Sequence, residues 1–296
     1  IALDAFRREI LSDEELGLGN SVHVNAYRVA GLVPGSLSLI LADLLPWAQV
    51  FWITAAFMLP GMIMALLVGA PAVSGAPKTL RQAVVEPFHE FIGRKGWSGA
   101  LLVLGFIFLY KLGDSLATAL STPFYLDLGY SKTDIGVIAK HAGLWPAVFG
   151  GLLGGLWMVR LGINRALWLF GVVQWVTILG FAWLAWRGVQ TSIDGVDRAA
   201  LAGVIAAEYL GVGLGTAAFT AFIARATNPA FTATQFALFT SLAAVPRTFI
   251  NAGAGALVEA VGWFSFFIIC FVLAAPGMAL LLKVAQWNET PPSPRP

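Results

Sequence analysis

Charged residues are scarce in this chain of 296 residues: Asp, Glu, Lys and Arg together make up 11%, whereas a soluble domain has about 25%. Hydrophobic residues make up 58% of the chain, more than a soluble fold of this size can bury. This composition excludes a disordered chain and argues against an ordinary soluble enzyme or a basic nucleic-acid-binding protein. The single cysteine, Cys270, excludes a disulfide scaffold and a cysteine metal site. The histidines have no metal-ligand spacing, so we expect neither a metal ion nor a cofactor.

In place of charge, the chain has a succession of apolar segments. A transmembrane helix needs about 20 mostly apolar residues, and the segments approach or exceed this length. No alternation of apolar and polar residues, typical of strands, lies between them. The predicted fold class is an all-α integral membrane protein. The expected spans are 1–11 (the end of one span), 18–41, 47–68, 99–120, 135–159, 166–186, 199–223, 233–257 and 263–282.

Positive charges divide unequally between the two sides of these spans. One set of connections holds eleven Lys and Arg residues, the other set holds three, and four lie inside spans. Cytoplasmic loops carry the excess of positive charge, so the first set and the C-terminus are expected in the cytoplasm. The connection between the third and fourth spans has apolar residues on one face, which predicts a short helix lying on the membrane surface.

Two parts of the chain repeat at a constant offset of 216 residues, at which Pro60-Gly61-Met62 recurs as Pro276-Gly277-Met278 and Trp47 matches Trp263. Many transporters consist of repeated halves. The repeat resembles the two six-helix halves in parallel repeat of the major facilitator superfamily, with the first three to four helices missing before residue 1. The expected parts are 1–69 (the tail of helix 4, with helices 5 and 6), 70–96 (a cytoplasmic linker with an amphipathic helix), 97–283 (helices 7 to 12) and 284–296 (a disordered cytoplasmic tail).

Ionisable residues inside the spans are costly to bury and therefore mark functional hypotheses. The cations point to an anionic or carboxylate-bearing solute, since Arg binds carboxylates bidentately and Lys acts as a point charge. The buried acids are candidate proton carriers. We expect solute contacts from Arg28, Tyr27, Lys111, Lys140, Gln235, Arg247 and Asn251, and proton coupling by Asp114, Glu208 and Asp4.

A structural role is the alternative for two of these groups. Asp4 and Arg7 lie three residues apart on one helix face, as do Lys111 and Asp114. Each pair could simply neutralise itself and hold helices together. Small residues four apart, such as Gly151 and Gly155, predict close helix packing in the fifth span.

Residues 155–165 resemble the second copy of the signature loop of the major facilitator superfamily, Gly-x-x-x-Asp-Arg-x-Gly-Arg-Lys. Val159 replaces the acidic residue and Ile163-Asn164 replace the basic pair, which puts the gating role of that acid in doubt in this chain. The resemblance implies a gating loop that contains Gly155, Arg160, Gly162 and Arg165.

Other segments look like the AmpG muropeptide permeases, a family of the same superfamily. The resemblance covers essentially the whole chain. It implies import of anhydro-muropeptides (GlcNAc-anhydroMurNAc with or without peptide) from periplasm to cytoplasm across the bacterial inner membrane. It further implies that this import is proton-driven and that it serves peptidoglycan recycling and, in some species, β-lactamase induction. The segments that carry the resemblance are 3–5, 27–28, 77–87, 109–114 and 231–238.

The sequence thus predicts a secondary active transporter, not an enzyme. Its expected partners are the muropeptide, protons and the lipid bilayer, with no nucleic acid, and it is expected to be a monomer. Two alternatives stay open. One is a major facilitator transporter of another anionic conjugate such as acetyl-CoA, and the other is a non-transporting membrane sensor.

Overall fold

The computed structural model describes residues 2–12, 14–31, 33–38, 41, 45–69, 79–131, 134–189, 193–228 and 231–287. Within these residues the regular structure is entirely helical. In chain order the elements are α1 (Ala2–Ile10), α2 (Leu16–Ala30), η1 (Val33–Leu37), α4 (Trp47–Ala56), α5 (Leu59–Leu67), α6 (Leu80–Leu109), α7 (Leu112–Ala119), α8 (Ser121–Asp127), η2 (Ile135–Ala139), α10 (Lys140–Arg187), α11 (Gly195–Ala226), α12 (Thr232–Val245), η4 (Pro246–Ile250), η5 (Asn251–Gly253) and α13 (Ala254–Val284).

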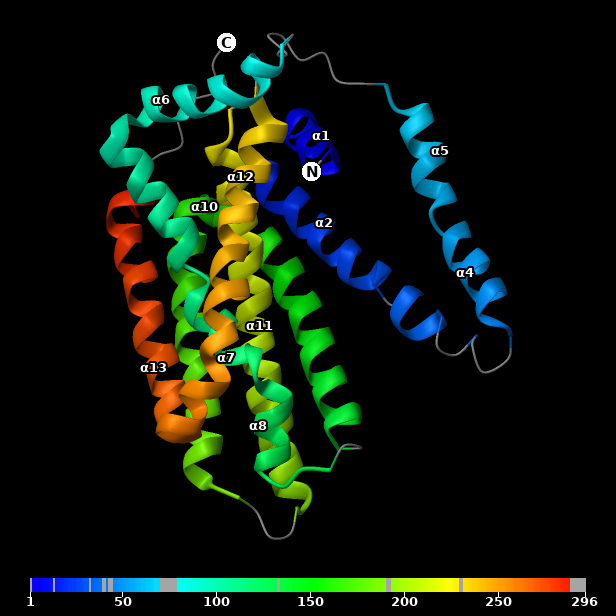
Figure 1. Cartoon of the computed structure of the whole chain (residues 1–296), viewed down its shortest axis with the longest axis vertical. Coiled ribbons are helices and arrows are strands. Elements are labelled where there is room, and N and C mark those ends of the chain that lie inside the picture. The colour runs from blue at the N-terminus through cyan, green and yellow to red at the C-terminus, as the bar shows by residue number, and fades with distance from the viewer. Residues whose placement is uncertain are drawn as a thin grey trace.

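Three of the longest elements each contain a glycine at which the chain changes direction. Gly96 in α6, Gly162 in α10 and Gly262 in α13 have φ angles of 69°, 73° and 75°, values that residues with a Cβ rarely adopt. In Figure 1, α6 first lies across one end of the bundle and then descends along it. The predicted spans 135–159 and 166–186 fall on the two sides of Gly162, and 233–257 and 263–282 fall on the two sides of Gly262.

Among the described residues, five helical stretches are long and apolar enough to cross a membrane, and three of them include one of these glycine turns. The long apolar helices confirm the predicted fold class, an all-α membrane protein. The stretches are Trp47–Leu67, Val85–Asp127, Val137–Arg187, Gly195–Ala226 and Thr234–Val284.

The bundle is built around α10, which packs on α11, α2 and α13 (Figure 1). Glycines permit this close packing, as predicted. A Cβ on Gly150 would overlap the carbonyl oxygen of Leu210 in α11, and one on Gly155 would overlap the Ser21 side chain of α2. The first part of α10 therefore has two small-residue faces, one toward α11 and one toward α2.

The pair α4 and α5 lies beside the bundle in Figure 1, and large apolar side chains are exposed along it, including Trp52 at 80% and Leu66 at 87%. Val50 is its one buried residue among those described. Helices that are apolar on all sides suit a lipid surrounding or further helices rather than water. Residues 70–78 of the predicted linker and 288–296 of the predicted tail lie outside the described residues.

Candidate functional site

The helix that begins at Trp97 is interrupted inside the bundle. α6 ends at Leu109 and α7 begins at Leu112, so Tyr110 and Lys111 lie at the break. The Tyr110 hydroxyl donates a hydrogen bond to the Leu167 carbonyl oxygen of α10 at 2.9 Å, and its ring stacks on Phe219 of α11. These contacts anchor the break among three elements and direct the Lys111 side chain to its neighbours.

The Lys111 ammonium has two oxygen partners. Its Nζ lies 2.7 Å from Asp114 Oδ2 and donates a hydrogen bond of 2.7 Å to Gln174 Oε1 of α10. The Asp114 side chain is only 6% exposed. The predicted pairing of Lys111 with Asp114 therefore forms, and a residue from a second helix completes it.

A second carboxyl group lies beside this pair. Glu208 of α11 is fully buried, and neither of its carboxyl oxygens has a hydrogen-bond partner within the described residues. Asp114, Lys111 and the Thr177 hydroxyl are its polar neighbours. We call Lys111, Asp114, Gln174 and Glu208 the Lys111 cluster.

The net charge of the Lys111 cluster determines whether it binds a proton. Two ionised carboxylates around one ammonium leave a net negative charge in the membrane interior, which is costly. One bound proton cancels it. The arrangement can therefore bind and release a proton as its surroundings change.

Asp4, Arg7 and His23 form a second group, the Asp4 cluster, between α1 and α2. Arg7 Nη2 and His23 Nε2 lie 3.2 and 3.4 Å from the same oxygen, Asp4 Oδ1. The Arg7 guanidinium also lies 6.0 Å from the centre of the Phe236 ring of α12. In this cluster one carboxylate is shared by two basic groups, the reverse of the Lys111 cluster.

The other predicted solute contacts are spread over the bundle. Asn251 donates from Nδ2 to the Ser115 carbonyl oxygen of α7 at 3.3 Å, and Arg28 donates to the Ala147 carbonyl oxygen of α10. Tyr27 and Arg247 are exposed. The side chain of Lys140 lies outside the described residues. The structure thus places Asn251 next to α7 but brings neither Arg28, Tyr27 nor Arg247 to the Lys111 cluster.

Two π-helical turns coincide with predicted solute residues. η2 ends directly before Lys140, and η4 contains Arg247. Such turns inside α-helices occur frequently at functional sites. They interrupt the regular backbone at the places where the sequence predicts contacts with the solute.

Gln235 lies at the start of α12, apart from the Lys111 cluster. Its Nε2 donates to Glu90 Oε2 at 2.7 Å and to the Pro87 carbonyl oxygen at 3.0 Å. Its Oε1 accepts a hydrogen bond of 2.7 Å from the backbone N–H of Asn228. The amide is therefore engaged in joining α12 to the crosswise part of α6.

The predicted gating loop surrounds the turn at Gly162. Gly155 packs on α2 and Arg160 is exposed, while Arg165 Nε donates to the Trp287 carbonyl oxygen at 3.3 Å. Asn164, one of the residues that depart from the signature, is buried. It donates to Gln286 and accepts from Arg225, so it ties the loop to α11 and to the segment after α13.

Sequence reasoning missed Gln174 and Thr177, both in α10. Their signal was available, since each is a polar residue within the apolar span 166–186. Uncharged side chains cost less free energy to bury than ionised ones. Their presence in a span is therefore a weaker indication of function than that of Lys111 or Glu208.

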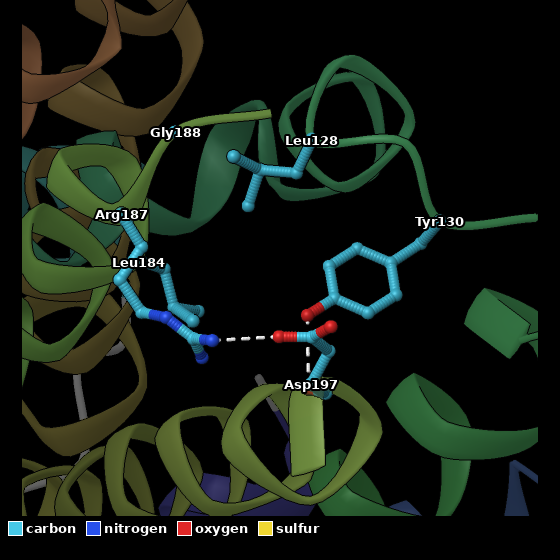
Figure 2. Close-up of a pocket in the computed structure, with 6 residues that line it drawn as sticks. All are labelled: Leu128, Tyr130, Leu184, Arg187, Gly188 and Asp197. Atoms are coloured by element: carbon cyan, nitrogen blue, oxygen red, sulfur yellow. Dashed lines mark hydrogen bonds and ion pairs between the residues drawn. The ribbon is translucent and has the colours of Figure 1, made fainter. Parts of the chain in front are cut away.

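A small pocket at the end of the bundle where α10 ends and α11 begins also holds charges. Figure 2 shows Arg187 directed at Asp197, with Tyr130 beside them. Arg187 Nη2 lies 2.7 Å from Asp197 Oδ1, and the Tyr130 hydroxyl donates to the Asp197 carbonyl oxygen at 2.9 Å. Because these groups bind one another, they hold the segment after α8 and the end of α10 to the start of α11.

Comparisons with known proteins agree with this architecture. The model of the Major Facilitator Superfamily matches residues 1–249. The chain is 53% identical over 292 residues to an uncharacterized protein of Haemophilus influenzae, covering 98% of the chain and 69% of that protein. It is 39% identical over 292 residues to the anhydromuropeptide permease of Escherichia coli K12, covering 98% of the chain and 57% of the permease. A Rickettsia felis protein named as transporter AmpG 4 is 30% identical over 290 residues, which cover 95% of the chain and 68% of that protein.

The chain thus spans a little over half the length of the permease. The family match extends from the first helix into η4, over most of the elements described above. It confirms the expectation of a multi-pass membrane transporter rather than an enzyme. The chain belongs to the major facilitator superfamily.

Proposed function

We propose that this protein imports anhydro-muropeptides from the periplasm to the cytoplasm by proton-coupled secondary transport. The observation that carries the proposal is the buried Lys111 cluster, which lies inside a bundle 39% identical over 292 residues to an anhydromuropeptide permease. A cluster that gains and loses a proton within a membrane supplies the coupling that such a transporter needs. Peptidoglycan recycling is the purpose this transport would serve.

The solute chemistry supports the same proposal. Muropeptides carry carboxylates, which Arg and Lys bind, and we propose that Arg28, Lys140 and Arg247 supply these contacts. Tyr27 and Asn251 would add neutral hydrogen bonds. Gln235 fits a holding role better, because both ends of its amide are engaged at the crosswise part of α6.

Within the Lys111 cluster we assign the proton to the two carboxyl groups. Asp114 keeps its salt bridge to Lys111, and Glu208 has no hydrogen-bond partner among the described residues. The remaining candidate, Asp4, is already shared by Arg7 and His23, which favours a role in holding α1 on α2.

The arrangement of the helices supports a cytoplasmic C-terminus, and we propose that the protein acts as a monomer. The crosswise part of α6 and the end of α13 lie at one end of the bundle (Figure 1). The Trp168 indole donates to the Ala285 carbonyl oxygen at this end, at 2.9 Å. The excess of positive charge predicted for the cytoplasm belongs to the connections at this end. We further propose that residues 1–69 and 97–283 belong to separate halves that move relative to each other.

Uptake of labelled anhydro-muropeptide by membrane vesicles that carry the intact protein tests the proposal. We expect accumulation that depends on the proton gradient and is not reduced by coenzyme A esters. Unchanged uptake after collapse of the gradient would contradict the coupling. Competition by coenzyme A esters would favour the alternative solute, and binding without flux would favour a sensor.

A further inference from the structure

We propose that Gln174 is a positioning residue that holds the Lys111 ammonium on Asp114, so that Glu208 is the carboxyl group that takes the proton. Its importance for transport rests on the proposed function, but its effect on proton binding can be measured without any solute. The inference begins from the contact between Lys111 Nζ and Gln174 Oε1, which is as short as the ion pair itself, at 2.7 Å.

Gln174 is 4% exposed, and its side-chain oxygen Oε1 accepts the hydrogen bond from Lys111. An ammonium has three N–H donors. In the cluster one is directed at Asp114 and one at Gln174, from α7 and α10 respectively. We infer that these two contacts keep the ammonium from pairing with Glu208, whose oxygens have no hydrogen-bond partner in the described part of the chain.

The surface of α11 is shaped for Gln174. Gly211 and Gly215 follow Glu208 at intervals of three and four residues, so all three lie on one helix face. A Cβ on Gly211 would lie 3.0 Å from Gln174 Cα, and a Cβ on Gly215 would overlap Gln174 Oε1. The glycines therefore form a slot that admits the Gln174 side chain and fixes its carbonyl oxygen beside Lys111.

Removal of Gln174 Oε1 by mutation should change the position of the Lys111 ammonium. Without Gln174 the ammonium loses one of its two oxygen partners, and we expect it to turn to the Glu208 carboxylate, whose oxygens have no hydrogen-bond partner among the described residues. A cation that pairs with Glu208 competes directly with the proton. The titratable groups that surround Glu208 from the neighbouring elements are Lys111, Asp114, Tyr125, Tyr209 and Cys270.

Infrared spectroscopy of the intact protein in lipid vesicles as a function of pH tests this inference. The carbonyl band of the protonated Glu208 is assigned by its loss in Glu208→Gln. We expect the pH midpoint of this band to fall by roughly one unit or more in Gln174→Leu and in Gly215→Ala, because a nearby cation shifts a carboxyl group by about this amount. Gly203→Ala is the matched control on α11, since a Cβ there meets no atom within 4 Å.

A double variant separates positioning from general loosening of the bundle. In Gln174→Ala the side chain that Gly215→Ala displaces is absent, so adding Gly215→Ala should move the midpoint no further. An unchanged midpoint in both Gln174→Leu and Gly215→Ala overturns the proposal, and so does the absence of a Glu208 band that titrates. If the wild-type protein carries no muropeptide, the proposed function fails, while the infrared midpoints still decide the role of Gln174.

Discussion

Two pairs of opposite charge in this protein have the same spacing but different surroundings. Asp4 and Arg7 lie three residues apart on α1. Lys111 and Asp114 also lie three residues apart, at the start of α7. Beside each pair lies a third ionisable residue, which comes from another helix. For Asp4 it is His23, a basic side chain, and for Lys111 it is Glu208, an acid.

The third residue reverses the balance of charge. The Asp4 cluster has two basic groups around one carboxylate, whereas the Lys111 cluster has two carboxyl groups around one ammonium. Protonation stabilises a carboxylate little when two basic groups already balance its charge. A carboxylate in excess of the basic groups inside a membrane is costly, and a bound proton removes that cost. The contrast teaches that the role of a helical ion pair is decided by the neighbouring helix and not by its own spacing.

The largest expected effect comes from removing the surplus acid. Glu208→Gln should abolish accumulation of muropeptide driven by a pH gradient. One coupled proton supplies about 1.4 kcal/mol per pH unit, which is roughly tenfold accumulation. Exchange of labelled for unlabelled muropeptide without a gradient should continue, because binding and the conformational change remain. Accumulation driven by the pH gradient and exchange without a gradient are both measured in the same vesicles.

Glu259→Gln is the matched control for this experiment, because Glu259 is an exposed acid on α13. It should leave both activities unchanged. An equal loss of accumulation in Glu208→Gln and Glu259→Gln would remove the special role of the Lys111 cluster.

A smaller effect is expected from the Asp4 cluster. Asp4→Asn leaves the buried Arg7 guanidinium without its carboxylate partner, so it should lower the stability of the protein. The Asp4 side chain is 26% exposed, so the loss should be about 1–2 kcal/mol, below the ~3–5 kcal/mol that follows when a fully buried pair is broken. Chemical unfolding in detergent measures this change. Loss of accumulation with normal exchange in Asp4→Asn would instead make Asp4 a proton carrier.

The smallest effect is expected from an ion pair between Arg198, whose side chain is 48% exposed, and Asp134, which lies outside the membrane-spanning segments. Asp134 Oδ1 lies 2.7 Å from Arg198 Nε, and the hydrogen bonds from Arg198 and Ser131 lower the pKa of Asp134 below its ordinary value of 3.8. Stability from this pair is therefore fully present above the ordinary pKa and is lost as the pH falls through the lowered pKa.

Arg198→Gln should consequently lower the melting temperature slightly at neutral pH, because exposed pairs contribute little. The difference from the wild type should disappear in strong acid, and transport should be unchanged. Thermal unfolding in detergent over a range of pH provides the measurement. A difference that grew as the pH fell would contradict the assignment.

The spans and the buried acids follow from local sequence. Composition alone predicts a span at 166–186, because a helix that crosses the membrane must be apolar along its length. Asp114 and Glu208 stand out because charges are rare in such helices. Their proximity could not be predicted, since it depends on how α7 and α11 pack against α10.

Gln235 illustrates the same limit. In the sequence it is a polar residue near the start of a span, which suggests a solute contact. Its partner Glu90 lies 145 residues earlier in the chain, and only the packing of α6 on α12 reveals that partner. Asn164 is similar, because its departure from the signature loop gives no hint that it joins Arg225 to Gln286.

The central claim is that the surplus carboxyl group of the Lys111 cluster carries the coupling proton. Simultaneous measurement of proton and muropeptide entry into vesicles with the intact protein tests it most directly. The account predicts that protons enter with muropeptide in the wild type and in Asp4→Asn, and that Glu208→Gln exchanges muropeptide with no proton flux. Proton entry with muropeptide in Glu208→Gln would contradict it.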